Sequence, residues 1–174
     1  MAGRLQAHDA PPVLRYRPVG VEYQVRAARI TDIDRLVALS DAGEPLLRRD
    51  GTLGSADLMR QLVYLPQASV FVAESHRDVV GGAILALRPS VRAGGFVGTL
   101  DLIVVDPATD VEAIMDSLLE EVVRSARNKG CVIVEAGRPP DAAGLERFGR
   151  MGFTEAGARL ERRVTEAGPE RAGR

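Results

Sequence analysis

The sequence has no tryptophan, one cysteine and two histidines, and only 4% of its 174 residues are aromatic. The single Cys131 excludes an internal disulfide and a cysteine-based zinc site, and two histidines argue against a histidine-rich metal centre. An excess of charge of either sign is also missing, since 23 basic residues stand against 24 acidic ones. Nucleic-acid binders need a clear basic excess, so we expect no nucleic-acid partner. The small number of cysteines and histidines leads us to expect no metal.

Long apolar runs are absent as well. The longest strongly apolar stretch, Val79 to Leu87, is far shorter than the ~20 residues that a membrane-spanning helix needs. Residues 1–20 mix charge, proline and glycine, and they lack the apolar core of a signal peptide. We therefore expect a cytoplasmic protein without a membrane partner.

The residues that are present fit one globular domain. Apolar residues make up 45% of the chain and charged residues 27%, which is ordinary for such a domain. A chain of this length buries enough surface to fold without disulfides or metals. Residues 1–20 and 166–174 are predicted to be tails, since both lack periodicity and contain glycine and proline. The domain is expected over residues 21–165.

The first half of the domain alternates between two types of periodicity. Strands are predicted over 22–29, 69–74, 79–87 and 96–105, and helices over 32–42 and from Ser55 to Val63. Thr31 begins a capping-type sequence before the first helix, and the short polar link at 76–78 predicts an antiparallel hairpin.

The second half contains the clearest helix. Apolar residues recur without a break at helical spacing from Val111 to Ala126, and Gly130 ends the pattern. Residues 131–135 predict a short strand buried on both faces, residues 141–150 a helix, and residues 153–158 and 159–164 two final strands. The expected order is β-α-α-β-β-β-α-β-α-β-β. This order is typical of an α/β domain (an α+β mixed sheet) with helices on both faces.

That order and two local strings resemble the GNAT superfamily of N-acetyltransferases. Residues 102–107, LIVVDP, resemble the family's fourth strand and its V-x-P exit, and residues 148–153, FGRMGF, resemble its Y-E-x-L-G-F turn. The resemblance covers residues 22–165. It implies a GNAT-like fold that binds acetyl-CoA, or another acyl-CoA, between its fourth and fifth strands. The acyl group would then pass to the amine of a small molecule or peptide.

The resemblance also implies where the coenzyme binds. Its pantetheine arm would pair with the backbone near residues 103–105, and its diphosphate would meet the first turn of the helix that begins near Val111. The coenzyme-binding residues implied in this way are Ile103, Val104, Val105, Asp110, Val111, Glu112, Ala113, Ile114, Met115 and Phe148.

The first turn of that helix departs from the family's R/Q-x-x-G-x-G/A pattern. Asp110 stands at the basic position, and Ala113 and Met115 stand at the two glycines, which allow the backbone to approach a diphosphate. Thr109 and Glu112 have the spacing of a capping box, whose side chains would occupy the amides that a phosphate uses. The alternative interpretation is therefore a well-capped amphipathic helix with no phosphate site.

The acid–base residues show a similar mixture. Phe148 stands where many relatives have the tyrosine that protonates the departing thiolate, and Asp141 replaces the usual asparagine. Asp101 aligns with an acidic position that some relatives use as general base, and a purely structural aspartate is the alternative. Glu135 is the second candidate base and Glu74 the third.

These residues leave three hypotheses open. The first is an acyl-CoA-dependent N-acyltransferase that works by direct attack in a ternary complex, because Cys131 is poorly placed for a covalent acyl intermediate. The second is a non-catalytic GNAT-fold module that binds a ligand or partner and has lost normal acetyl-CoA binding. The third is an acyltransferase whose donor lacks the CoA diphosphate. Formation of a homodimer is left open.

Overall fold

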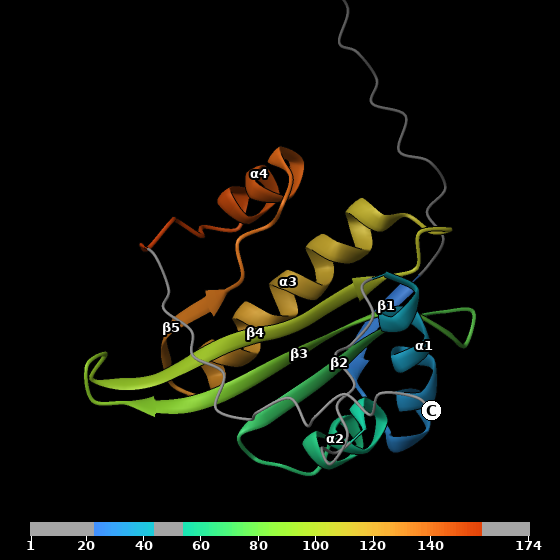
Figure 1. The fold of residues 1–174 in the computed structure, drawn as a ribbon, viewed down its shortest axis with the longest axis horizontal. Helices are drawn as coiled ribbons and strands as arrows, with labels where there is room; N and C mark the ends of the chain where they lie inside the picture. Colours follow the sequence, from blue (N-terminus) through green and yellow to red (C-terminus); the bar gives the residue numbers. More distant parts are fainter. Residues whose placement is uncertain (1–22, 44–53, 158–174) are drawn as a thin grey trace, which may run out of the picture.

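The computed structural model describes residues 23–43 and 54–157, which form a five-stranded mixed sheet with helices on both faces (Figure 1). The strands are β1 (Tyr23–Ala27), β2 (Ala68–Ser75), β3 (Asp78–Ser90), β4 (Gly95–Val105) and β5 (Cys131–Ala136), and they lie in this order across the sheet. Neighbours run antiparallel up to β4, whereas β4 and β5 run parallel. The predicted mixed sheet is confirmed.

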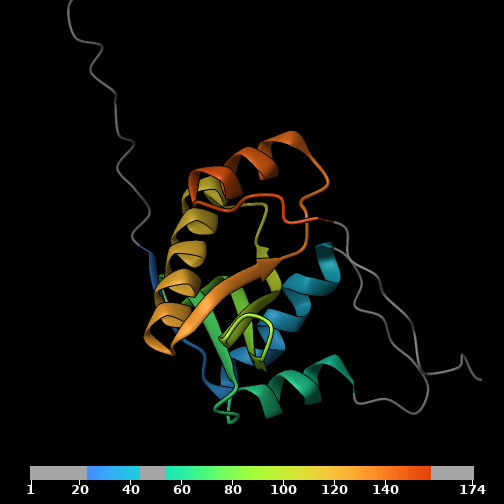
Figure 2. The same ribbon diagram turned by 90° about the vertical axis from the view of Figure 1, so that its left-hand side faces the viewer.

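Helices cover both faces of the sheet. They are the 3-10 turn η1 (Ile30–Asp32), α1 (Ile33–Gly43), α2 (Ser55–Leu62), α3 (Val111–Asn128) and α4 (Ala142–Arg150). Figure 2 shows α3 on one face of the sheet and α1 and α2 on the other. The connection through α3 makes β4 and β5 parallel, since parallel neighbours need a crossover. In the described residues, no helix is long and apolar enough to cross a membrane.

The core lies on both sides of the sheet. The apolar stripe of α3 is buried as predicted, through Ile114, Leu118, Leu119, Val122 and Ala126. These side chains pack against the face of the sheet that carries Leu85 and Leu100. On the other face, a second cluster joins Ile33, Leu36 and Met59 to Val70 and Ile84. Each fully buried aliphatic side chain contributes about 1.5–3 kcal/mol, so both faces of the sheet stabilise the domain.

The β2–β3 hairpin forms at the predicted place. His76 and Arg77 form its two-residue turn, and both have positive φ angles of 50° and 73°, as the tightest hairpin turns require. Farther along β3, a Cβ atom on Gly82 would lie 2.5 Å from a Leu36 methyl carbon. This glycine therefore allows α1 to pack closely on the sheet.

Some sequence predictions differ from the structure. Val132 and Ile133 are 57% and 47% exposed, because β5 is the last strand of the sheet in the described residues and the cluster under α1 and α2 includes none of its side chains. Leu58, expected on the apolar face of α2, is also exposed. Residues 153–157 form no strand, and the strand predicted over 159–164 lies outside the described residues, as do both predicted tails.

Candidate active site

Strands β4 and β5 separate before β4 ends. Their pairing runs from Phe96 with Cys131 to Leu100 with Ala136. Strand β4 then continues to Val105, where only β3 pairs with it among the described strands. The backbone groups of residues 101–105 that face away from β3 are therefore an open strand edge, which can pair with an extended ligand.

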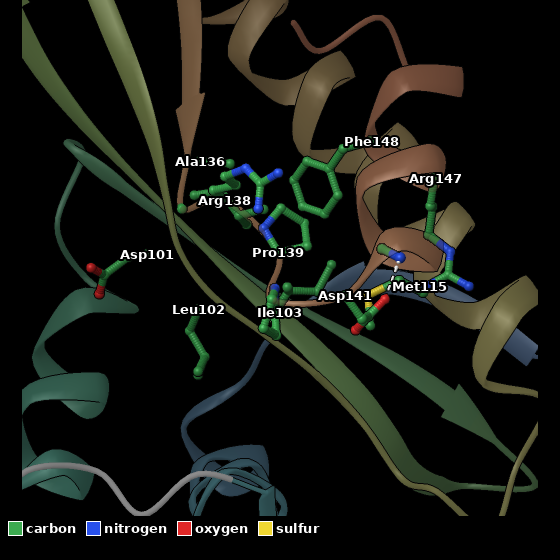
Figure 3. A pocket seen from close by; sticks show the side chains of 14 residues that line it. Asp101, Leu102, Ile103, Met115, Ala136, Arg138, Pro139, Asp141, Arg147 and Phe148 are labelled. Carbon is green, nitrogen blue, oxygen red and sulfur yellow. Dashed lines mark hydrogen bonds between the residues drawn. The ribbon is translucent and has the colours of Figure 1, made fainter. Parts of the chain in front are cut away.

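A cavity of about 360 Å³ lies where the two strands separate (Figure 3). It is bounded by β4, the end of β5, the segment that follows it, α4 and one side chain of α3. The lining residues are Leu100, Asp101, Leu102, Ile103, Met115, Ala136, Gly137, Arg138, Pro139, Pro140, Asp141, Gly144, Arg147 and Phe148. The cavity lies at the carboxyl end of β5 and beside residues 100–103 of β4, where the parallel pairing of the two strands stops.

Asp101 occupies a β-bulge in β4. Leu85 pairs with Leu100 and Ile84 with Leu102, so Asp101 is the extra residue without a partner on β3. Its side chain is exposed, and no hydrogen bond or ion pair within the described part of the chain reaches it. Figure 3 shows Asp101 directed away from the cluster around Phe148 and Arg147. A bulge re-aims a side chain in this way without breaking the strand.

The inner wall of the cavity is apolar. Phe148 is half-buried, and its ring lies edge-on to Phe153, with centroids 5.1 Å apart. The Phe153 amide donates to the Phe148 carbonyl (3.0 Å) across the predicted turn, where Gly152 has a φ of 84°. Met115 lines the cavity from α3. Neither Phe148 nor Met115 can donate a proton to a leaving group.

The chain itself caps the N-terminus of α3. The Asp110 carboxylate accepts a hydrogen bond from the Ala113 amide (3.2 Å), so Asp110 is the N-cap. The predicted capping box of Thr109 and Glu112 does not form, because the Thr109 hydroxyl donates to the Asp106 carbonyl (2.7 Å) and Glu112 pairs with Arg147. The cap lies one residue later than the sequence pattern indicated, since the turn at Asp106 already uses the threonine.

Arg147 is the charged residue that the sequence reasoning missed. It projects from α4, is only 8% exposed, and forms ion pairs with Glu112 and Asp116 of α3, with Nε 3.1 Å from the Asp116 carboxylate. Glu112 raises the pKa of the Arg147 guanidinium, and Arg147 lowers the pKa of the Glu112 carboxylate. The sequence signal was two acids spaced i and i+4 on one helix, which need a cation between them.

The start of α4 forms the opposite wall. The Asp141 carboxylate accepts a hydrogen bond from the Gly144 amide (2.6 Å) and caps the helix. A Cβ atom on Gly144 would lie 2.8 Å from the Pro139 side chain. The glycine therefore lets the segment after β5 fold tightly against α4 and leaves the cavity open.

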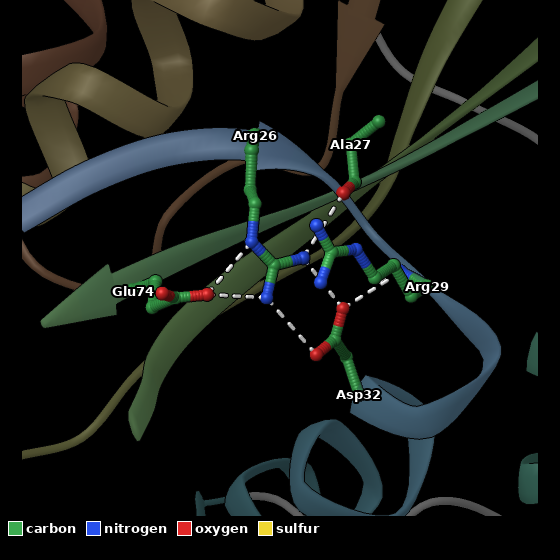
Figure 4. Close-up of polar contacts among 5 residues, drawn as sticks. All are labelled: Arg26, Ala27, Arg29, Asp32 and Glu74. Atoms are coloured by element: carbon green, nitrogen blue, oxygen red, sulfur yellow. Dashed lines mark hydrogen bonds and ion pairs between the residues drawn. The ribbon is translucent and has the colours of Figure 1, made fainter. Parts of the chain in front are cut away.

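The other candidate bases are engaged elsewhere. Glu135 lies outside the cavity and accepts two hydrogen bonds from Arg88 (3.1 and 3.2 Å). Glu74 accepts a hydrogen bond from Arg26 Nε (2.7 Å), and Arg26 also binds Asp32 (Figure 4). Asp32 further accepts from the backbone amide of Arg29 (2.7 Å), and Arg26 lowers the pKa of its carboxyl. This cluster joins β1, β2 and the 3-10 turn η1, so Glu74 has a structural role.

The implied coenzyme-binding residues fall into two groups. Ile103, Met115 and Phe148 line the cavity, whereas Val104, Val105 and residues 110–114 do not. Ile114 is buried in the core, and the Ala113 carbonyl accepts from the Tyr23 hydroxyl (3.0 Å). In the part of the chain that the structure describes, no group of three or more His, Cys, Asp and Glu side chains is arranged to hold a metal ion. The two arginines that line the cavity, Arg138 and Arg147, are paired with Glu155 and Glu112 of the chain itself.

Comparisons with known proteins agree with this geometry. The chain is similar to an acetyltransferase from Trypanosoma brucei, with 19% identity and a TM-score of 0.66 over 82% of this chain and 100% of the other. A putative acetyltransferase from Agrobacterium tumefaciens gives 20% identity and a TM-score of 0.68 over 80% and 99%. Glucosamine-6-phosphate N-acetyltransferase from Arabidopsis thaliana gives 14% identity and a TM-score of 0.64 over 83% and 99%.

These structural similarities show the fold, and a sequence-family comparison shows the membership. No curated protein matches the sequence. The model of the acetyltransferase (GNAT) family matches residues 37–153, which is more than half of the chain and includes β4, α3, β5 and α4. The chain therefore belongs to the GNAT acetyltransferase family.

Proposed function

We propose that this protein transfers an acyl group from a pantetheine thioester, such as acetyl-CoA, to the amine of a small molecule or peptide. The separation of β4 and β5 carries this proposal. It leaves an open strand edge beside a cavity of about 360 Å³, with an exposed carboxylate on the same stretch of β4.

The donor arm is assigned to the gap between the strands. Pantetheine contains two amide groups in an extended chain, so it can pair with the free edge of β4 at residues 103–105 in the manner of an added strand. Its sulfur end would then lie near Phe148 and Met115, two apolar side chains that pack against it without adding charge. Membership of the acetyltransferase family supports an acyl thioester as the donor.

Asp101 is assigned as the general base. Its carboxylate takes a proton from the acceptor ammonium, and the freed lone pair forms a bond from nitrogen to the thioester carbon. The carbon–sulfur bond then breaks, and the thiolate leaves. Positioned proton transfer of this kind contributes about 10²–10⁴-fold to a rate. The nitrogen must lose a second proton when the amide forms, and because Phe148 has no proton to give, a water molecule would carry that second proton from the nitrogen to the thiolate.

Direct attack is favoured over a covalent acyl-enzyme. Cys131 is the chain's single cysteine, and it lies at the start of β5, outside the cavity that begins at Ala136. Burial raises the pKa of the Cys131 thiol, which favours the unreactive protonated form.

The test compares Asp101→Asn with the wild type and with Asp78→Asn, which changes an exposed aspartate of the β2–β3 hairpin. Thiol release from acetyl-CoA is measured with a panel of amines, and the dissociation constant of the thioester by calorimetry. Asp101→Asn should lower kcat at least about 100-fold with little change in affinity. Equal rates in Asp101→Asn and the wild type would remove Asp101 from the mechanism.

A non-catalytic binding module is the second candidate function. The absence of a proton donor on Phe148 and the acidic first turn of α3 favour it. In that case the wild-type chain would bind a thioester, or another ligand, in the cavity and would release no thiol with any amine. Turnover by the wild type that Asp101→Asn abolishes would exclude this candidate.

A further inference from the structure

We propose that this chain recognises its donor through the pantetheine thioester arm alone, and that the diphosphate of CoA adds no affinity. This inference rests on the proposed function, and it specifies which part of the donor the chain binds. Four observations at the N-terminus of α3 carry it.

Four of the six backbone amides at residues 108–113, where a diphosphate would bind, are already used. From residue 108 to residue 113, four backbone amides (108, 109, 111 and 113) donate to oxygen atoms of the chain itself, at 2.9–3.2 Å. A helix N-terminus binds an anion through free amide donors and the helix dipole. Here Asp110 already occupies that position with its own carboxylate.

The charges around this turn are also unfavourable for an anion. Asp110, Glu112 and Asp116 place three carboxylates within the first two turns of α3. The Glu112 side chain is 70% exposed, so its carboxylate faces the solvent from which a diphosphate would approach. Arg147 is the cation that touches this group, and Arg150 acts on Glu112 only through space.

Arg147 does not supply a free positive charge. Its side chain is 9% exposed and is held between Glu112 and Asp116. Its Nε lacks a hydrogen-bond partner among the described residues and lies 3.1 Å from an Asp116 carboxylate oxygen. Two carboxylates therefore balance the charge of Arg147, and moving this side chain to a diphosphate would leave Asp116 half-buried without its cation.

The pantetheine end has none of these obstacles. Residues 101–105 keep an open backbone edge, and the apolar part of the cavity beside them is lined by Ile103, Met115, Ala136 and Phe148. Apart from Asp101, the charged side chains of the same lining are engaged within the chain: Arg138 pairs with Glu155, Arg147 pairs with Glu112, and Asp141 caps α4. This end needs hydrogen bonds and apolar contact but no charge. The chain therefore keeps the part of the site that holds an uncharged arm, and its own side chains fill the part that would hold the diphosphate.

The experiment titrates the full-length chain with S-acetylpantetheine and with acetyl-CoA by calorimetry, each at low and at physiological salt. The two dissociation constants should agree within about threefold, and that of acetyl-CoA should change little with salt because no phosphate is neutralised. Acetyl-CoA binding at least about tenfold tighter than S-acetylpantetheine, with affinity falling as salt rises, would overturn the inference.

A double variant tests the electrostatic cause. Asp110→Ser with Glu112→Gln removes two negative charges while serine keeps the N-cap. Acetyl-CoA should bind about tenfold tighter to this variant, because two negative charges at the helix N-terminus no longer repel its diphosphate, and S-acetylpantetheine should be unaffected. The matched control, Asp78→Ser with Glu120→Gln, removes two exposed charges elsewhere and should change neither affinity. An unchanged acetyl-CoA affinity in the first variant contradicts the inference.

The possible outcomes separate the two proposals. If neither thioester binds the wild-type chain, the proposed function fails and the inference fails with it. If acetyl-CoA binds and S-acetylpantetheine does not, the proposed function stands and only the inference fails.

Discussion

The two ends of the candidate donor site differ in what forms them. At the gap between β4 and β5, backbone groups of residues 101–105 and apolar side chains surround an open cavity. At the N-terminus of α3, the helix that follows β4 in the chain, Asp110 caps the helix and Glu112 pairs with Arg147. The chain's own side chains therefore fill the second of these ends and leave the first open.

The two properties, strand separation and anion binding, depend on the fold to different degrees. The separation of β4 and β5 follows from strand pairing that stops at Leu100, and many sequences can produce it. Anion binding depends on a few particular residues, and a single aspartate at the N-cap changes it. Fold membership therefore supports the thioester end of the site more strongly than the phosphate end.

The largest effect on thioester affinity is expected from blocking the cavity between β4 and β5. Gly137 lines the cavity, and a Cβ atom there would meet nothing within 4 Å, so Gly137→Leu should fold normally and occupy the cavity. Both thioesters should bind at least about 100-fold more weakly, because the arm has no second place to bind. Calorimetry measures this loss.

The control for that variant is Gly149→Leu. Gly149 also has nothing within 4 Å of its Cβ position, but it lies on the exposed side of α4 outside the cavity. Its thioester affinity should equal that of the wild type. Full affinity in Gly137→Leu would mean that the donor does not bind between the strands.

A smaller effect, on the free energy of unfolding, is expected from changing the ion pairs at the N-terminus of α3. Arg147→Met removes the cation between Glu112 and Asp116 and should lower the free energy of unfolding by about 1–3 kcal/mol, because a half-buried carboxylate loses its partner. Urea unfolding measures the change. Arg150→Met, which removes an exposed helical pair with Glu146, should cost less than about 0.5 kcal/mol. Equal losses in the two variants would contradict the buried role of Arg147.

The smallest effect is a pH dependence of stability from the ion pair between Glu112 and Arg147. Arg147 holds the pKa of Glu112 below its ordinary value, so this ion pair stabilises the chain above about pH 4.5. The stabilisation is lost as the pH falls through the lowered pKa of the folded chain. Glu112→Gln should therefore unfold slightly more easily than the wild type at pH 7, and the two midpoints should converge under acid. Urea midpoints from pH 7 to 2.5 measure this, and a constant difference would exclude Glu112 as the titrating group.

Periodic parts of the fold could be predicted from the sequence. The unbroken stripe from Val111 to Ala126 defined α3, and the polar link at 76–78 defined the hairpin, because both depend on local spacing. The exposure of Val132 and Ile133 could not be predicted, since it depends on β5 lying at the edge of the described sheet.

The site was predictable only in part. Asp101, Ile103, Met115 and Phe148 all line the cavity, because strand and turn motifs fix their places. Arg147 was missed because the two acids at i and i+4, Glu112 and Asp116, indicate a place for a cation on α3 but do not tell which residue of another helix supplies it. Charge contacts of this kind follow from tertiary packing and not from spacing along the chain.

Amide hydrogen exchange of the wild-type chain, with and without saturating acetyl-CoA, tests the central claim most directly. We predict that the ligand slows exchange at residues 101–105 and leaves the amides of residues 108, 109, 111 and 113 unchanged, because an added arm pairs with the open edge of β4 while these four amides are already bonded. Slower exchange at 108–113 without any change at 101–105 would contradict the account.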